Sequence, residues 1–397
     1  MASTTPPLSP PGVDPAPYIL ADAPYRWTDH LFIPSLHAPT LVQLGGGVPL
    51  VGLVLAGGDR LGLQRWSATG LVQVGTADRR SHGSGAISYS NTLLAPWTLG
   101  LAASSYRWDQ SLTVVGDDTS YVRARRRRDG ALSFGRSWRG VLAAALSGIV
   151  TDDFDQFDQF AVEVPRRRTL GGGGLDLAWG IADGTRHGGT RRGLALFTTA
   201  AYYPAALSTL AGQVVDVGAT VSVVVPVPAT RRHAIALSTR GRAIEADDEA
   251  ALLEVGGPAL FTPLYTRAST TPPILADDLR LPPGVGFAEP VRGFEDLVVR
   301  TDRALVGHAS WTYPLIIDRG LATTWFLPAS FLRQLDLELF AAGWRDLIPR
   351  QHHAAAGGAL TLRLSLFQLP LALQYQLGRR LTDDEAWTHT VGLGPDL

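Results

Sequence analysis

Residues 213–225 read QVVDVGATVSVVV, and they show most clearly the alternation that indicates a β fold. Its odd-numbered positions from 215 onward are all apolar, namely Val215, Val217, Ala219, Val221, Val223 and Val225. The positions between them include Asp216, Gly218, Thr220 and Ser222. Because successive side chains of a strand point to opposite faces, the pattern predicts a strand with one apolar face and one small or polar face.

The same alternation recurs in segments spread along the chain. It is clear in residues 175–179, 335–339, 360–366 and 369–377. Two environments produce it: a soluble sandwich or propeller with a core on one side, and a membrane barrel with lipid outside and a polar lumen. The second faces are rich in Gly, Ala, Ser, Thr, Asp, Gln and Arg rather than in Lys and Glu, and this mixture favours a crowded lumen.

The composition excludes several classes of protein. Of the 397 residues, 45% are hydrophobic and 18% are charged, which excludes global disorder. The chain contains no cysteine, so disulfides, thiolate metal sites and a cysteine nucleophile are ruled out. Its formal net charge is −1, so no general electrostatic attraction favours nucleic acid, and no nucleic-acid partner is expected.

Three uncharged stretches have the length of a transmembrane helix, but their residues favour strands. They are residues 31–58, 81–106 and 193–215. Proline and glycine interrupt the first two, and Pro204 divides the third into two segments with strand-like periodicity. Aromatic residues such as Trp97 and Trp138 recur near the expected strand ends, as in the interfacial girdles of membrane barrels, although ordinary sheets also contain them.

The organisation that follows is one all-β domain behind an N-terminal segment. Residues 1–44 are rich in proline and aperiodic, which predicts a linker or a plug-like entry segment. Residues 45–397 are predicted to form a transmembrane antiparallel β-barrel of about 16 strands. The first residues, MASTTPPLSPPGVDPAPY, lack the basic and apolar regions of a secretory signal, so we expect a piece of a longer precursor.

Seventeen segments have strand character, one more than sixteen, so one is expected to be wrong or half of a bent strand. They are residues 48–56, 61–75, 83–92, 97–108, 119–127, 131–138, 140–150, 172–182, 192–203, 213–225, 232–241, 304–313, 321–327, 334–343, 357–366, 369–378 and 386–393. Two long insertions, residues 151–171 and 241–303, are expected between them.

The second insertion holds the most specific motif. Val291, Arg292, Gly293 and Phe294, within GVGFAEPVRGFEDLVV, resemble the VRGY/VRGF signature of the outer-membrane assembly and transport barrels. This is the bacterial surface antigen superfamily, to which BamA, TamA and the two-partner secretion transporters belong. ALVGHASWTYPLI, LDLELFAAGW and THTVGLGPDL are similar to strands of that family, and GGDRLGLQRW resembles the early hairpin of barrels fused behind TolB-like propellers. The likeness covers about residues 45–397.

The resemblance implies specific roles for the motif. In that family the signature loop folds back into the lumen, and its arginine meets acidic and aromatic groups of the inner wall. Carried over, Arg292 is a buried lumenal cation, Gly293 a tight-turn residue and Phe294 a packing wedge. Ala341 stands where the family acid is expected, so Asp336 and Glu338, on the polar face of the same expected strand, become the candidate partners. The alternative is a chance tetrapeptide in a surface loop.

The function implied by the resemblance is insertion or translocation of polypeptide at the bacterial outer membrane, or anchoring of an upstream periplasmic domain. Expected partners are outer-membrane lipid and lipopolysaccharide, with client outer-membrane proteins or periplasmic assembly factors in addition. A passive pore or structural anchor, and a soluble β-rich binding protein, are the alternatives. We expect no cofactor, no metal and no enzyme activity, because Ser81, Ser84, Ser88 and His308 lie in no catalytic motif.

Three polar clusters remain. The arginine-rich residues 123–128 fit a strand end or hairpin with lumenal arginines, or a contact with lipopolysaccharide. Asp152, Asp153, Asp155 and Asp158 fit a flexible external loop, or a hard-cation site through oxygen ligands. His352 and His353 are expected in a loop, because neighbouring residues of a strand point apart and make a weak metal pair.

Overall fold

The structure is a computed structural model that describes most of the chain. The described residues are 26, 28, 30–43, 50–73, 83–113, 120–138, 141–157, 166–185, 189–227, 230, 233–247, 252–256, 288–289, 291–295, 297–317, 330–347, 351–366, 369–382 and 385–395.

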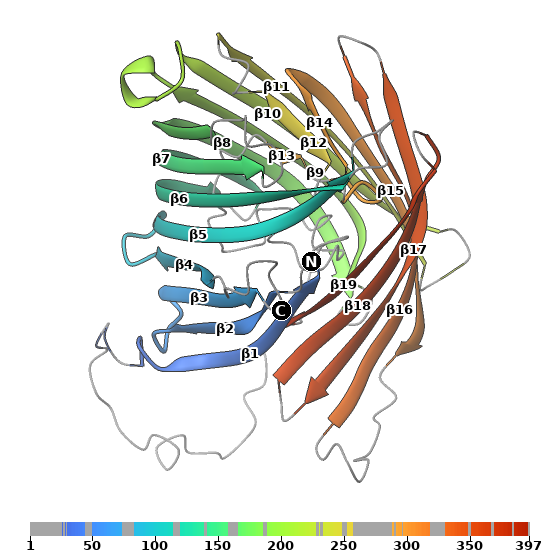
Figure 1. Ribbon diagram of the computed structural model, residues 1–397. Helices are drawn as coiled ribbons and strands as arrows, with labels where there is room; N and C mark the ends of the chain where they lie inside the picture. The colour runs from blue at the N-terminus through green and yellow to red at the C-terminus, as the bar shows by residue number, and fades with distance from the viewer. Residues whose placement is uncertain are drawn as a thin grey trace, which may run out of the picture.

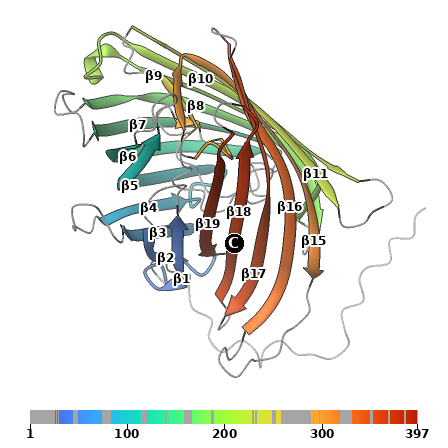
Figure 2. The same cartoon turned by 45° about the vertical axis from the view of Figure 1, so that its right-hand side comes forward.

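Sixteen antiparallel strands close into one barrel (Figures 1 and 2). In chain order they are β1 (Pro34–Gln43), β2 (Leu50–Gly58), β3 (Gln64–Gln73), β4 (Gly83–Asn91), β5 (Trp97–Thr113), β6 (Ser120–Trp138), β7 (Leu142–Phe157), β8 (Arg166–Thr185), β9 (Gly189–Tyr203), β10 (Val214–Pro226), β11 (Ala234–Ala246), β15 (Arg303–Ile317), β16 (Ser330–Asp346), β17 (His352–Leu366), β18 (Leu369–Arg380) and β19 (Trp387–Pro395). Each strand pairs with its neighbour in this order, and β19 pairs with β1. The prediction of an antiparallel barrel of about 16 strands is confirmed.

Strand β10 shows which face of the wall meets the lipid. Val217 and Val221 are 44% and 43% exposed, whereas Asp216 and Ser222 are each 6% exposed. The apolar face therefore lies on the outside of the barrel and the polar face on the inside. This is the reverse of a soluble sandwich and is the arrangement of a membrane barrel. Among the described residues, no helix has the length and apolar character needed to cross a bilayer.

The apolar outer face continues around the barrel. Its exposed members include Leu53, Leu101, Leu132, Leu146, Leu177, Leu237, Leu339 and Leu373. At one edge of this band Trp97 stacks on Phe134 with ring centroids 4.8 Å apart, and the Arg136 guanidinium lies over the rings of Trp97 and Trp138. These residues form part of the aromatic girdle expected where a barrel meets the membrane surface.

The two ends of the barrel differ. Strand β1 begins and β19 ends at the same end, because the barrel has an even number of strands. Connections at that end include two short ones, residues 59–63 and 139–141. The opposite end carries the long connection, residues 247–302. Outer-membrane barrels have short periplasmic turns and longer extracellular loops. The end with residues 247–302 is therefore the extracellular end.

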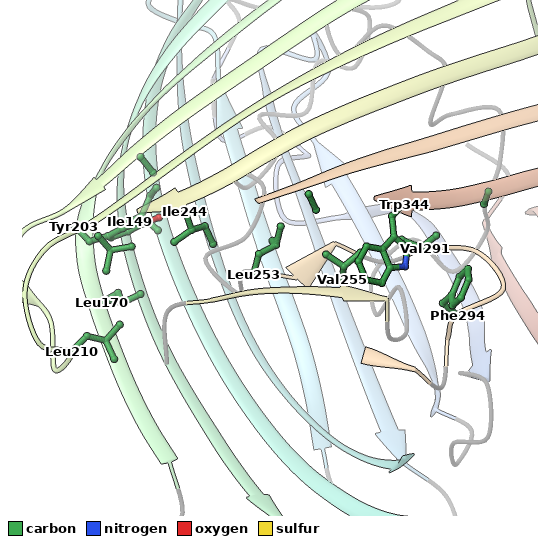
Figure 3. Packing of buried hydrophobic residues seen from close by; sticks show 14 of the residues in the cluster. Ile149, Leu170, Tyr203, Leu210, Ile244, Leu253, Val255, Val291, Phe294 and Trp344 are labelled. Carbon is green, nitrogen blue, oxygen red and sulfur yellow. The ribbon is translucent and has the colours of Figure 1, made fainter. Parts of the chain in front are cut away.

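Part of that long connection folds into the barrel. β12 (Leu253–Gly256), β13 (Ala288–Glu289) and β14 (Val298–Thr301) form a three-stranded sheet, seen inside the ring of wall strands in Figure 1. We call this sheet, together with residues 291–295, the lumenal plug. Leu253, Val255, Val291 and Phe294 of the plug pack against wall residues such as Trp344, so the main apolar core lies between plug and wall (Figure 3).

Two expected boundaries are wrong, and two expected segments are not tested. The barrel begins at Pro34 and not at residue 45, because two prolines within β1 obscure its alternation. The segments 119–127 and 131–138 are one strand, β6, since Asp129 and Gly130 continue the ladder and do not form a turn. The segment 321–327 and residues 1–25 of the expected linker lie outside the described residues.

Two further expectations are corrected. Most of residues 151–171 is not an insertion but the paired extension of β7 and β8, so Asp152, Asp153 and Asp155 lie in a strand. Asp152 accepts two hydrogen bonds from Arg167, at 2.8 and 3.3 Å, across this ladder. Asp158 lies outside the described residues. His352 and His353 open strand β17 and are not in a loop, because the ladder with β16 extends to them.

Candidate functional site

Arg292 occupies the centre of the candidate site, inside the lumen. It is 3% exposed, and its Nη1 and Nη2 donate to Glu338 Oε1 and Oε2 at 2.9 and 3.2 Å. The planar guanidinium thus meets both oxygens of one carboxylate, which is the pairing that arginine makes and lysine cannot. Glu338 lies on the polar face of β16, where the sequence alternation places it.

Other wall strands complete the surroundings of Arg292. Its Nε donates to Gln376 Oε1 of β18 at 2.7 Å, and Nη1 lies 3.1 Å from His308 Nε2 of β15. Because a guanidinium only donates hydrogen bonds, His308 Nε2 accepts here. The guanidinium carbon is 3.9 Å from the centroid of the Phe340 ring, which adds a cation–π contact. One side chain therefore ties β15, β16 and β18 together.

Gly293 allows the motif to lie directly on the wall. Its φ angle is +86°, a conformation that other residues adopt only at a cost. A Cβ atom on this residue would lie 2.5 Å from the Cβ of Ala355 on β17. A Cβ on Gly378 of β18 would in turn lie 3.3 Å from the Gly293 Cα, so glycine on both sides permits the close approach.

Phe294 and Val291 anchor the motif by packing. Phe294 is fully buried and Val291 is 2% exposed. The Phe294 ring meets His353 edge-on at 6.3 Å, and His353 stacks on Trp344 with ring centroids 4.0 Å apart. The labelled side chains of Phe294, Val291 and Trp344 lie together in Figure 3. Truncating such buried side chains leaves a cavity, so the wedge is expected to be intolerant of small residues.

Glu295 belongs to the site, although the sequence motif ends before it. Its Oε1 accepts from the Gly293 backbone N–H at 3.0 Å and from Gln376 Nε2 at 2.8 Å. Since Gln376 also accepts from Arg292, these contacts close a ring of hydrogen bonds that fixes the tight turn. The polar alternation of β18 placed Gln376 on the lumenal face, but nothing in the sequence singled out Glu295.

Asp336, the other candidate partner of Arg292, lies on the same face of β16 but has different neighbours. Its carboxylate accepts from Gln334 Nε2 at 2.6 Å and from Arg363 Nε at 3.1 Å. It is 4% exposed, so these contacts satisfy a charge that is removed from water. The structure therefore brings Arg292 together with Glu338, and gives Asp336 a separate role in the wall between β16 and β17.

A second ionic cluster, which the sequence did not indicate, holds the plug to the neighbouring wall strands β10 and β11. Arg242 of β11 donates to both carboxylate oxygens of Asp216 on β10, at 2.9 and 2.6 Å. Arg240 Nη1 lies 2.7 Å from Glu289 Oε1 of β13, and Arg242 Nη1 lies 3.8 Å from the same oxygen. All four groups are largely buried. The alternate positions of Arg240 and Arg242 on β11 were the available sequence signal for this cluster. Their shared partner, Glu289, lies far along the chain and could not be inferred.

The closed sixteen-strand wall defines the fold class of this protein: it has the fold of the BamA-like β-barrels of the bacterial outer membrane. No family model and no curated protein matches the sequence. Solved structures do match. CdiB from Escherichia coli superposes with a TM-score of 0.55 at 13% identity, over 90% of this chain and 62% of that chain.

Two further structures agree. CdiB from Acinetobacter baumannii gives a TM-score of 0.55 at 13% identity, over 90% of this chain and 59% of that one. BamA from Haemophilus ducreyi lacking POTRA domains 1-3 gives 0.52 at 13% identity, over 90% and 70%. At this identity the likeness concerns the fold. The chain spans about three fifths of the two CdiB chains.

Proposed function

We propose that this barrel inserts or translocates polypeptide at the outer membrane by opening between its first and last strands. The observation that carries the proposal is the short seam between β1 and β19. In the described residues the two strands pair only at Leu41 with Leu393, Val42 with Gly392 and Gln43 with Val391. By contrast, β10 pairs with β11 along all of Val214–Pro226.

The chemistry of β1 also favours a weak seam. Pro34 and Pro39 cannot donate a backbone hydrogen bond, and proline is confined to edge strands and the ends of strands for this reason. The Thr40 hydroxyl adds one hydrogen bond to the Leu393 carbonyl at 3.0 Å. Among the described residues, opening this seam breaks few hydrogen bonds, and it exposes two strand edges, which can pair with a client strand by β-augmentation.

The lumenal motif supports this opening by keeping the rest of the wall intact. Arg292 and Gln376 connect the plug to β15, β16 and β18, which lie on the β19 side of the seam. The plug also holds β11 through Glu289. The contiguous wall strands from β11 to β18, held together from inside, can keep their shape while the seam separates.

Anchoring of an upstream periplasmic domain is the second candidate function. It is supported by the placement of the β1 start at the periplasmic end, where such a domain would attach. A passive pore is less compatible with a lumen that holds the plug, so it serves as an outcome of the test below.

A disulfide across the seam tests the proposal. The chain has no cysteine, so Leu41→Cys with Leu393→Cys gives a single possible bridge. The oxidised barrel, in lipid vesicles, is offered a urea-unfolded eight-stranded outer-membrane protein as client, and client folding is followed by heat-modifiable gel mobility. We expect the wild type to accelerate folding several-fold, the bridge to abolish this acceleration, and reduction to restore it.

The matched control is Leu237→Cys with Ala309→Cys, which bridges β11 and β15, wall strands joined by the long connection. This bridge is expected to leave the acceleration unchanged. Conductance in planar bilayers should be the same for both oxidised variants. If the wild type does not accelerate client folding, or if the seam bridge leaves the acceleration intact, the barrel does not work through its seam. The function would then be that of an anchor for a periplasmic domain or of a passive pore.

A further inference from the structure

A groove with a volume of about 620 Å³ lies on the outer, lipid-facing surface over β5 to β10. Its lining includes Leu132, Leu146, Leu175 and Tyr202, all of which are exposed apolar or aromatic side chains. Gly148 and Gly173 form part of its floor. They are directly opposite each other on β7 and β8, so the wall is thin at this point and the flanking side chains stand above it.

The glycines leave space that a side chain could fill. A Cβ atom on Gly148 would meet nothing within 4 Å, and one on Gly173 would meet only a backbone oxygen at 3.4 Å. On the neighbouring strands, Leu132 of β6 lies opposite Gly148, and Tyr202 of β9 lies opposite Gly173. A channel with apolar sides and a glycine floor on a lipid-facing wall fits an acyl chain.

Arginines lie above this groove, toward the extracellular end and on the same outer face. On the outer face of β7, Gly148 is followed by Val150 and then by Asp152. Asp152 lies opposite Arg128 of β6 and Thr169 of β8. Four residues along a strand correspond to about 13 Å. In the next outward row, Arg126 of β6 lies directly opposite Arg107 of β5.

Electrostatics favours an anion at these two rows. Among the described side chains they contain Arg107, Arg126, Arg128 and Arg167 but one carboxylate, Asp152. Like charges directly opposite on a sheet repel each other. The Arg167 side chain stays 62% exposed although it pairs with Asp152, so its surface is accessible to a ligand. Arg127, between Arg126 and Arg128, does not belong to this outer face. Its side chain points to the lumen, where its Nε lies 2.8 Å from Asp129 Oδ2.

We propose that this face is a binding site for a phosphate-bearing lipid of the outer leaflet. The lipid phosphate lies against Arg126 and Arg128, and one acyl chain lies in the groove over Gly148 and Gly173. Arginine binds phosphate oxygens through paired hydrogen bonds, and the apolar groove below gains from burying methylene groups. Position supports the assignment, because the arginines lie at the extracellular edge of the apolar band, where outer-leaflet headgroups are found.

Two variants test the two halves of the site. Gly148→Leu fills the groove, and Arg126→Gln with Arg128→Gln removes the phosphate partners. The matched controls are Gly307→Leu, a lipid-facing glycine of β15 whose Cβ would also meet nothing within 4 Å, and Arg136→Gln in the girdle at the opposite edge of the band. All proteins are first shown to be folded by heat-modifiable mobility, and Gly173→Leu replaces Gly148→Leu if the latter does not fold.

Binding is measured by native mass spectrometry of the full chain in mild detergent. The probes are bisphosphorylated lipid A, the same lipid without its phosphates, and inorganic phosphate. We expect a one-to-one lipid A complex that both test variants weaken at least tenfold and both controls preserve. Equal binding of the dephosphorylated lipid, displacement by inorganic phosphate at similar concentration, or unchanged binding by the test variants would each overturn the proposal.

Discussion

Arg292 concentrates several interactions in one side chain, and this makes it the residue whose replacement has the largest expected effect. Its fork binds Glu338, its Nε binds Gln376, and its face covers Phe340. Removing one partner of a buried ion pair leaves the other charge without compensation. The cost of breaking such a pair generally exceeds the value of the pair itself.

Arg292→Ala is expected to lower the free energy of unfolding by about 3–5 kcal/mol, because it leaves the Glu338 carboxylate buried without its partner. Arg292→Lys should recover only part of this loss, since lysine lacks the planar fork. The measurement is urea unfolding in lipid vesicles, combined with Glu338→Gln in a double-mutant cycle. A loss below 1 kcal/mol for Arg292→Ala, or additive effects in the cycle, would contradict the account.

Gly293→Ala is expected to destabilise the site for two separable reasons, the positive φ angle and the approach of the new Cβ to Ala355. Ala355→Gly in the same chain removes the clash and leaves the backbone cost, which is about 1–2 kcal/mol. The double variant should therefore be more stable than Gly293→Ala alone and less stable than the wild type. Thermal loss of heat-modifiable mobility measures the order, and equal stability of the three proteins would refute the argument.

The sequence predicted this site in part. Alternation placed Glu338 and Asp336 on one lumenal face, and the family resemblance placed Arg292 near them. Neither could choose between the two acids, because the choice depends on how far the connection between β11 and β15 reaches along β16. Glu295 was missed for the same reason: its contact with Gln376, a residue that alternation does place on the lumenal face, joins positions that are far apart along the chain.

Among the elements, the lumenal plug depends most on tertiary contacts. Its strands β12, β13 and β14 are 4, 2 and 4 residues long, shorter than most strands of globular proteins, so the sheet depends on packing against the wall. Wall residues cover its apolar side, and Glu289 joins it to Arg240 on β11. The plug is therefore expected to respond locally when this ion pair is removed.

Glu289→Gln is expected to loosen the plug without opening the barrel, because it removes the charge that pairs with Arg240 and lies near Arg242. Amide hydrogen exchange of Leu253–Gly256 should become faster, while exchange in β10 and β11 stays unchanged. Glu385→Gln is the control, since its partner Arg379 forms an exposed pair that contributes little. Unchanged exchange in the plug would show that packing alone holds it.

Strand prediction succeeded where two faces differ and failed where they do not. The alternation of β10 gave its bounds to within a residue or two, because valine faces lipid and small polar residues face the lumen. Asp129 and Gly130 resemble a turn, yet β6 continues through them because β5 and β7 pair with it on both sides. β1 was missed because proline interrupts its pattern, and the plug strands are too short to show a period.

For the molecule as a whole, the uneven closure of the barrel is the property from which the proposed function follows. Apolar residues face the lipid along the wall, and charged residues are kept for the lumen and the ends. Most neighbouring strands share long ladders, whereas β1 and β19 share three described residue pairs. The low share of charged residues in the chain is thus explained by the fold, because the outward-facing positions of the wall strands meet lipid and seldom accept a charge.

Hydrogen exchange at the β1–β19 seam measures how readily the barrel opens there. In the wild-type barrel in lipid vesicles, amides of Leu41 and Gln43 on β1 and of Val391 and Leu393 on β19 are compared with those of β10 and β11. We predict exchange at the seam that is at least tenfold faster than in the β10–β11 ladder, and faster still with unfolded client present. Protection at the seam equal to that of β10 and β11 would contradict the account.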